Sequence, residues 1–206
     1  MSLDLLKSDP MSATQRCTFR TGPAAGSFAL SNEGSLCKIT CTKLADDIFD
    51  LKATAGAGTD YFYPWLQRGY GWVKVPKDAP NGTVVMTGGV NGCTLIVSES
   101  AGFYYFYHDG DSCNLPASAI VGAQVAKVQP KDYDPLRRGE QMFKDALAEM
   151  ARAGKKPVGD ISYGHFVVAV KKGGKFGFYV TGLMSMNGLT RLPYAITPCI
   201  VTFGDD

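Results

Sequence analysis

Two neighbouring runs of strand-forming residues constrain the fold of this chain more than any other feature. Leu95–Val97 is continuously apolar and Phe103–Tyr107 is continuously aromatic, with a reversal at Ser98–Gly102 between them. β-Branched and aromatic residues favour strands, and so short a connection pairs them antiparallel. The sequence therefore predicts a β-hairpin whose open end joins the residues just before the first run to those just after the second.

This hairpin brings a thiol and an imidazole to the same end. Gly92 permits a tight turn just before Cys93, and His108 directly follows the aromatic run. A free thiol is only a few per cent ionised at neutral pH, so a neighbouring imidazole makes it a useful nucleophile. Most cysteines in folded chains are packing residues, and a catalytically inert pair fits the same pattern.

The second histidine, His165, is the competing imidazole. Gly164-His165 followed by a valine-rich strand resembles the histidine strand of papain-like peptidases. Those enzymes place their cysteine at a helix N-terminus, whereas Cys93 is followed by strand-forming residues. A histidine at a strand edge is also commonly structural. A cysteine peptidase or transglutaminase using Cys93 with His165 stays open, as does a non-catalytic binding module.

Composition excludes several classes of function. The chain has 206 residues, of which 45% are hydrophobic and 19% charged, with a net charge of +2. Such a charge gives no global basic field, so nucleic acid is not an expected partner. The sequence shows neither an apolar run long enough to cross a bilayer nor a signal peptide. We expect one domain that acts as a monomer.

The cysteines are expected to be reduced thiols. A nucleophilic Cys93 must remain free, which leaves an odd number for disulfides. The pair Cys37 and Cys41 has no second Cys or His pair at ligand spacing, and both residues fall on one face of a strand, so no metal site is expected. The six cysteines are Cys17, Cys37, Cys41, Cys93, Cys113 and Cys199.

Hydrophobic patterning predicts many strands and one strong helix. Residues 1–15 lack periodicity and are expected to be a flexible or expression-derived N-terminus, with the domain spanning residues 16–206. The helix is expected to begin near Asp134-Pro135, to carry an apolar stripe and to stop at Gly154. The predicted strands are Thr18–Arg20, Ser27–Leu30, Leu36–Leu44, Thr83–Met86, the two strands of a hairpin that turns at Gly173-Gly174, and the last strands from Pro193 to Phe203. This pattern predicts an α/β (α+β) fold, a mixed β-sheet sandwich flanked by helices.

An aromatic-rich segment, Tyr61–Trp72, precedes the hairpin and contains both tryptophans. Its simplest interpretation is core packing, which we favour for Trp65. The alternative is that the segment forms a wall of a substrate cleft, with Tyr63, Trp65 and Asp109 as the candidate lining residues.

The motif Gly92-Cys93-Thr94-x-Ile96-Val97, with a histidine fifteen residues after the cysteine and Gly110 beyond it, resembles the catalytic domain of the cytotoxic necrotizing factors, which are glutamine deamidase toxins. Burkholderia lethal factor, a second member, has a Pro-Trp pair and a threonine where Pro64-Trp65 and Thr87 lie, and a shorter loop from cysteine to histidine. The resemblance covers roughly Tyr61 to Gly110. The family's Leu-Ser-Gly-Cys is Val90-Asn91-Gly92-Cys93 here.

The resemblance implies a cysteine-dependent protein-glutamine deamidase. Cys93 is expected as the nucleophile and His108 as the general base, with Thr87 holding the other imidazole nitrogen. The Asn91 side chain and the Cys93 backbone N–H are the candidate oxyanion donors. No metal or organic cofactor is required.

The resemblance further implies a host regulatory protein as the substrate, either a Rho-type small GTPase or a translation-initiation helicase. The chain is expected to be a secreted or translocated effector without its own recognisable signal peptide, acting in the host cytosol. It is either free-standing or the catalytic domain of a larger toxin.

Overall fold

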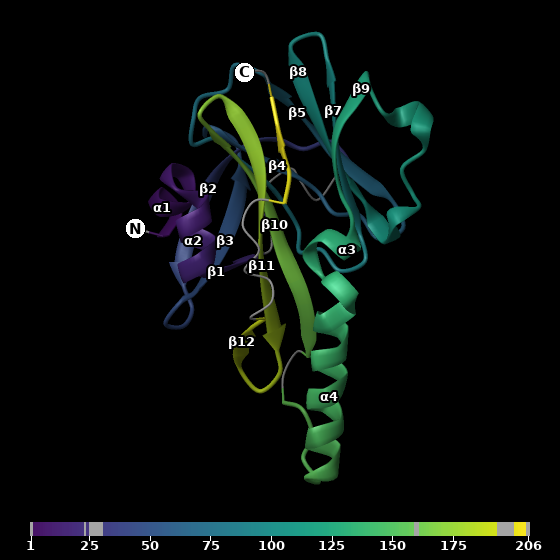
Figure 1. The fold of residues 1–206 in the computed structure, drawn as a ribbon. Coiled ribbons are helices and arrows are strands. Elements are labelled where there is room, and N and C mark those ends of the chain that lie inside the picture. Colours follow the sequence, from purple (N-terminus) through teal and green to yellow (C-terminus); the bar gives the residue numbers. More distant parts are fainter. Residues whose placement is uncertain (1, 23, 25–30, 159–160, 193–199, 205–206) are drawn as a thin grey trace.

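Two β-sheets, one large and one small, form the body of the molecule (Figure 1). The structure is a computed structural model that describes residues 2–22, 24, 31–158, 161–192 and 200–204. Strands of the large sheet follow the order β1-β3-β2-β4-β6-β10-β11-β12, with β13 also paired to β11. Their bounds are β1 Thr18–Thr21, β2 Ser35–Lys43, β3 Ile48–Ala55, β4 Asp60–Tyr63, β6 Val84–Thr87, β10 Ser162–Lys172, β11 Lys175–Ser185, β12 Leu189–Arg191 and β13 Thr202–Phe203.

The small sheet contains the predicted hairpin. Its order is β5-β8-β7-β9, with β5 at Tyr70–Pro76, β7 at Thr94–Ser100, β8 at Phe103–Asp109 and β9 at Ala123–Val128. The reversal between β7 and β8 is confined to Ala101 and Gly102, both at positive φ, which matches the twist of an antiparallel pair. The hairpin is therefore confirmed, with longer strands than the apolar runs alone predicted.

The two sheets pack face to face around one core, as expected for a sandwich. Alternate residues of each strand enter this core: Leu95 and Val97 from β7, and Val167 and Ala169 from β10. At its centre Phe106 contacts Phe176 with ring centroids 5.6 Å apart. Because both sheets contribute whole strand faces, the polar residues that share these faces are carried into the inter-sheet space.

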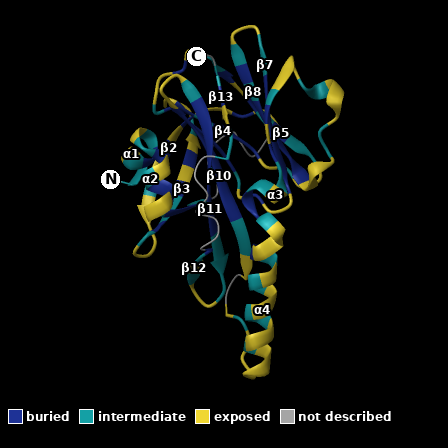
Figure 2. Ribbon diagram, in the orientation of Figure 1, coloured by how far each residue is buried: buried dark blue, intermediate teal, exposed yellow. Residues whose placement is uncertain are grey.

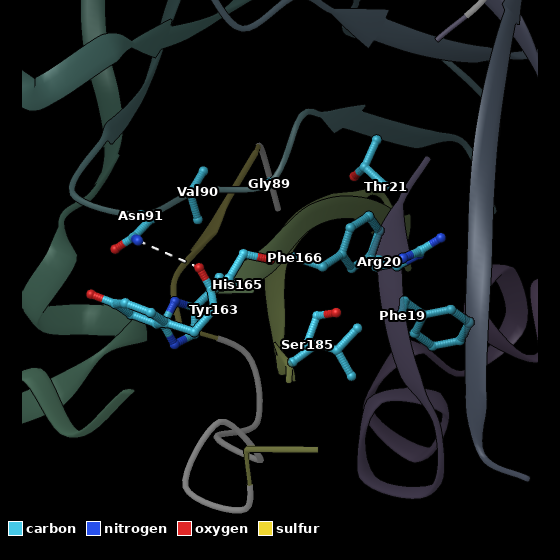
Figure 3. A pocket seen from close by; sticks show the side chains of 13 residues that line it. Phe19, Arg20, Thr21, Gly89, Val90, Asn91, Tyr163, His165, Phe166 and Ser185 are labelled. Atoms are coloured by element: carbon cyan, nitrogen blue, oxygen red, sulfur yellow. Dashed lines mark hydrogen bonds between the residues drawn. The ribbon is translucent and has the colours of Figure 1, made fainter. Parts of the chain in front are cut away.

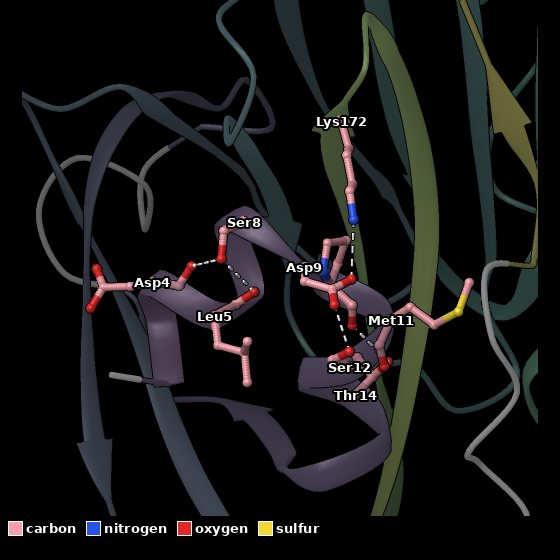
Figure 4. A network of polar contacts seen from close by, with 9 residues as sticks. Asp4, Leu5, Ser8, Asp9, Met11, Ser12, Thr14 and Lys172 are labelled. Atoms are coloured by element: carbon pink, nitrogen blue, oxygen red, sulfur yellow. Dashed lines mark hydrogen bonds and ion pairs between the residues drawn. The ribbon is translucent and has the colours of Figure 1, made fainter.

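The opposite face of the large sheet is covered by two short helices, α1 at Ser2–Ser8 and α2 at Pro10–Arg16. Leu6 and Ala13 are fully buried in this second core. Lys172 of β10 forms an ion pair with Asp9 at 3.1 Å, and Figure 4 shows this link beside the helices. The N-terminal segment, expected to lack regular structure, is helical here because its few apolar residues meet the sheet face.

The predicted helix begins later than its sequence signals suggest. It comprises α4, Arg138–Arg152, preceded by α3 at Pro130–Tyr133 and a single 3₁₀ turn, η4, at Pro135–Arg137. Leu136 and Arg137 have φ of 60° and 53°, a left-handed conformation that interrupts the helix. Its apolar stripe is only half-buried, and α4 extends beyond the sheets with much of its surface exposed (Figure 2).

The long hairpin of β10 and β11 is confirmed, with its turn at Gly173 and Gly174. The predicted strand Ser27–Leu30 lies outside the described residues, as does most of the predicted Pro193–Phe203 region, where β13 forms the described end. None of the helices in the described ranges is both long and apolar enough to cross a membrane.

Candidate active site

Cys93 and His108 face the same side of the small sheet. Leu95 pairs with His108 across β7 and β8, and directly opposite residues share a face. Cys93 lies two residues before Leu95 and joins the same buried cluster, so its side chain points to the inter-sheet space. The imidazole is therefore a diagonal neighbour of the cysteine rather than its direct partner.

His108 is the most constrained polar residue of the site. It is fully buried, and its Nδ1 lies 2.8 Å from Oγ1 of Thr87, which belongs to β6 of the other sheet. Burial lowers the pKa of His108 to about 3, so the imidazole is neutral at physiological pH. Its Nε2 has no hydrogen-bond partner among the described residues. Nδ1 is thus bonded to Thr87, whereas Nε2 forms no hydrogen bond with the described residues.

Cys93 lies directly before β7, and its residue surface is 3% exposed. The turn before it depends on Gly92, whose φ of +85° favours glycine. The thiol Sγ is 4.0 Å from the Asn91 carbonyl, and the Cys93 carbonyl accepts a 2.9 Å hydrogen bond from the Tyr133 hydroxyl. The described structure has no bond between the thiol and Nε2 of His108. Catalytic hydrogen bonds are often long in unliganded enzymes and tighten when substrate binds.

The two oxyanion candidates differ in their availability. The Asn91 side chain is directed to β10, where its Nδ2 donates to the carbonyl of Tyr163 at 3.4 Å (Figure 3). A pocket of about 290 Å³ adjoins this contact, lined by Asn91, Tyr163 and residues of β1 among others. An amide engaged with β10 must break that bond before it can reach an oxyanion at Cys93. The backbone N–H of Cys93 is the candidate that needs no such rearrangement.

The cleft candidates occupy three different environments. Trp65 is 49% exposed, so the core-packing interpretation that we favoured for it is wrong. It lies over the loop before the cysteine, because a Cβ built on Gly88 would be 3.1 Å from Cβ of Trp65. Tyr63 is instead fully buried between the sheets and lines no open cleft. The Asp109 carboxylate is also buried, and it accepts the backbone N–H groups of residues 114 and 115 at 2.7 and 2.9 Å, which fixes the loop after β8.

His165 also faces the inter-sheet space, from β10. Its backbone N–H and C=O both bond to Val90, at 2.9 and 2.8 Å, and its ring centroid lies 5.1 Å from that of Tyr133. Burial lowers the pKa of His165, and the nearby Asp134 carboxylate partly opposes that effect. These contacts attach the loop that precedes Cys93 to the large sheet.

Three strained loops surround the cysteine, a feature that the sequence analysis missed. Non-glycine residues seldom adopt positive φ, at a cost of about 1–2 kcal/mol each, and such strain concentrates at functional sites. Each loop contacts the site: Gly110 donates to the carbonyl of Gly69 beside the first, Ser112 in the second bonds to Gly92, and Leu136 in the third lines a cavity with Gly92. The residues at positive φ in these loops are Arg68, Asp111, Ser112, Leu136 and Arg137. Only Asp111 is of a type that favours this conformation, and glycine occupies none of these positions.

The described part of the chain holds no cluster of three or more His, Cys, Asp or Glu side chains that would suit a metal ion. Its five cysteines are unpaired, and Cys199 lies outside that part. Burial raises the pKa of Cys37 to about 12, and burial likewise raises the pKa of Cys17 and of Cys41. These three thiols are therefore poor nucleophiles at neutral pH.

The fold and the site together define an α+β protein with a cysteine and a neutral, threonine-bound imidazole between two sheets. Comparison with known proteins found no matching family profile and no matching curated protein. Among solved structures, the C-terminal domain of CNFy from Yersinia pseudotuberculosis aligns at 10% identity over 65% of this chain, with a TM-score of 0.28. The alignment spans 61% of that domain's chain. Similarity this low carries no argument about family or function.

Proposed function

We propose that this protein is a toxin or effector that deamidates a glutamine of a host protein through a thioester on Cys93. The observation that carries the proposal is the bond between Thr87 and Nδ1 of His108, which leaves Nε2, on the face that Cys93 shares, without a partner in the described part of the chain. Thr87 comes from β6 of the large sheet and His108 from β8 of the small sheet, and Cys93 directly precedes β7 of the small sheet. The sequence motif around Cys93 supplies the expected chemistry.

In the proposed reaction, Nε2 of His108 takes the thiol proton while Sγ of Cys93 bonds to the carboxamide carbon. The carbonyl oxygen becomes an oxyanion, which the Cys93 N–H stabilises. Collapse of this intermediate breaks the carbon–nitrogen bond, and the imidazolium returns its proton to the leaving ammonia. Water then hydrolyses the thioester, which leaves glutamate and the free thiol. Thr87 accepts from Nδ1–H and so holds the tautomer whose Nε2 carries the lone pair that can take the thiol proton.

The neutral state of His108 suits this sequence of steps. Burial lowers the pKa of His108 to about 3, so protonation of this imidazole is costly. A resting thiolate–imidazolium pair is therefore disfavoured. The charge pair forms only when substrate is in place, where the developing oxyanion and its donor share the cost.

Modification of a protein substrate is the expected outcome, with a Rho-type GTPase or a translation-initiation helicase in the host cytosol as the candidate targets. Conversion of glutamine to glutamate adds a negative charge and removes an amide donor. A glutamine that positions a water or couples conformations would lose its function.

The proposal is tested by incubating the protein with eukaryotic lysate and comparing it with Cys93→Ser. We expect ammonia release and glutamine-to-glutamate changes, seen by mass spectrometry, only with the wild-type protein. Amine incorporation or peptide-bond cleavage would indicate a transglutaminase or a peptidase instead. Identical profiles for the two proteins would favour a binding module.

Cys93 is expected to be the first thiol labelled by iodoacetamide below pH 7, because His108 can take the thiol proton as the carbon–sulfur bond forms. The exposed Cys113 serves as an internal control for access. In His108→Gln, labelling of Cys93 should slow about tenfold while labelling of Cys113 stays unchanged. Peptide mapping by mass spectrometry measures both rates. Preferential labelling of Cys37 or Cys113 in the wild-type protein would count against Cys93 as the nucleophile.

Trp65→Ala is expected to raise KM for the protein substrate about 30-fold and to leave kcat within threefold. An exposed tryptophan beside the cysteine loop suits an anchor for a protein surface, and such anchors contribute about 2 kcal/mol or more. Trp72→Phe is the matched control, because Trp72 stacks on Tyr105 within β5 and β8. A fall in kcat at constant KM would place Trp65 in the chemistry rather than in docking.

A further inference from the structure

The two peptide groups that flank Cys93 are each held by a side-chain hydroxyl. Ser112 donates to the carbonyl of Gly92 at 2.8 Å, and the buried Tyr133 donates to the carbonyl of Cys93 at 2.9 Å. Ser112 in turn accepts a 2.7 Å bond from Oγ1 of Thr94. Both donors come from segments outside β7 and the loop that carries the cysteine.

These hydroxyls act where the β-ladder ends. Strand β9 pairs with β7 only as far as Val128, which lies opposite Leu95, and the chain then turns into α3 at Pro130. Cys93 therefore has no strand residue beside it on that edge. The Tyr133 hydroxyl takes the place of the missing ladder donor. No backbone carbonyl within the described ranges receives the N–H of Cys93.

Peptide planarity connects the Gly92 carbonyl to the oxyanion donor. The C=O of Gly92 and the N–H of Cys93 belong to one planar trans unit and point in opposite directions. A hydroxyl that fixes this carbonyl therefore fixes the direction of the N–H. Gly92 needs such a constraint because glycine at φ +85° has no Cβ to limit rotation of the adjoining peptide. A cavity of about 390 Å³, lined in part by Gly92, Pro130 and Tyr133, adjoins this peptide.

We infer that Ser112 and Tyr133 are positioning residues that hold the Cys93 N–H in the orientation that an oxyanion requires. The inference rests on the proposed role of Cys93 as the nucleophile. Neither residue touches the reacting atoms. Ser112 acts through the Gly92 carbonyl, which shares a peptide plane with the Cys93 N–H, and Tyr133 acts from the other side of the Cys93 Cα by holding the following peptide.

Two reagents separate this role from general support of the fold. With p-nitrophenyl acetate, the Cys93 sulfur bonds to the ester carbonyl carbon, an oxyanion forms, and p-nitrophenolate leaves. With iodoacetamide, the sulfur displaces iodide from a saturated carbon and no oxyanion forms. In Ser112→Ala and Tyr133→Phe, acylation of Cys93 should slow about tenfold, whereas alkylation should stay within twofold. Both rates are measured at Cys93 by mass spectrometry.

Matched controls exist in the same sheet. Ser98 donates to the Val121 carbonyl at 2.6 Å, and the Tyr107 hydroxyl accepts from the Val121 N–H at 2.9 Å. Ser98→Ala and Tyr107→Phe therefore each remove a bond to Val121 that does not involve the peptides flanking Cys93, and both rates should stay within twofold. Unchanged acylation in Ser112→Ala and Tyr133→Phe, or an equal loss in both reactions, would overturn the inference. If the acylation effect holds but lysate proteins release no ammonia, deamidation fails and the positioning role stands.

Discussion

Cys93→Ser and His108→Ala are each expected to lower the deamidation rate by at least about 10³-fold while leaving the fold intact. Residues that act as one catalytic unit are each indispensable, so either loss removes nearly the whole rate enhancement. Initial rates of ammonia release on the substrate identified from lysate provide the measurement. Circular dichroism and thermal unfolding establish that the variants are folded.

His165→Gln is the discriminating control for this pair. His165 shares the inter-sheet space and contacts Tyr133, which binds the Cys93 carbonyl, so an indirect effect of up to about tenfold is expected. If His165→Gln is instead the inactive variant and His108→Ala is active, the catalytic imidazole is that of His165 on β10. The papain-like interpretation would then replace the one proposed here.

The part of the site that sequence predicted depends on local pattern. Strand-forming runs on both sides of Ala101-Gly102 fix the hairpin, and alternation along its strands then places Cys93 and His108 on one face. The approach of Thr87 to His108 was expected only from the family resemblance. Nothing local links β6 to β8, because that contact depends on how the two sheets face each other.

The other features of the site and fold depend on tertiary contacts that leave no pattern in the sequence. In the sequence, Tyr133 lies at the end of a polar stretch and shows no sign of a role. Its hydroxyl can bind the Cys93 carbonyl only because β9 stops pairing with β7 at Val128. Trp65 carries a strong core signal from its size, yet it lies on the surface beside Gly88. The N-terminal helices are too short to be predicted from periodicity, and their few buried residues are covered only by the large sheet.

Acid is expected to destabilise the folded protein below pH 6.5 through its buried histidine. An unfolded histidine binds a proton near pH 6.5, whereas His108 in the folded protein resists protonation until the pH approaches about 3. Between these pH values the unfolded state binds more protons than the folded state. The free energy of unfolding therefore decreases by up to about 1.4 kcal/mol for each unit by which the pH is lowered. The stabilising contribution of the neutral imidazole is fully present above pH 6.5 and is lost progressively as the pH falls toward 3.

Urea unfolding at intervals from pH 7.5 to 5.0 measures this effect, because ordinary carboxyl groups titrate mostly below that range. His108→Gln keeps a polar side chain but has no titratable group, so its free energy of unfolding should vary less with pH, and the difference between the two slopes isolates His108. Burial also lowers the pKa of His165, which accounts for the residual slope in His108→Gln and predicts a flatter profile when both histidines are replaced. Equal slopes for the wild-type protein and His108→Gln would mean that the imidazole is hydrated in the folded state. A hydrated His108 would lack the burial cost of an imidazolium, so the same measurement tests, without any substrate, the argument against a resting thiolate–imidazolium pair.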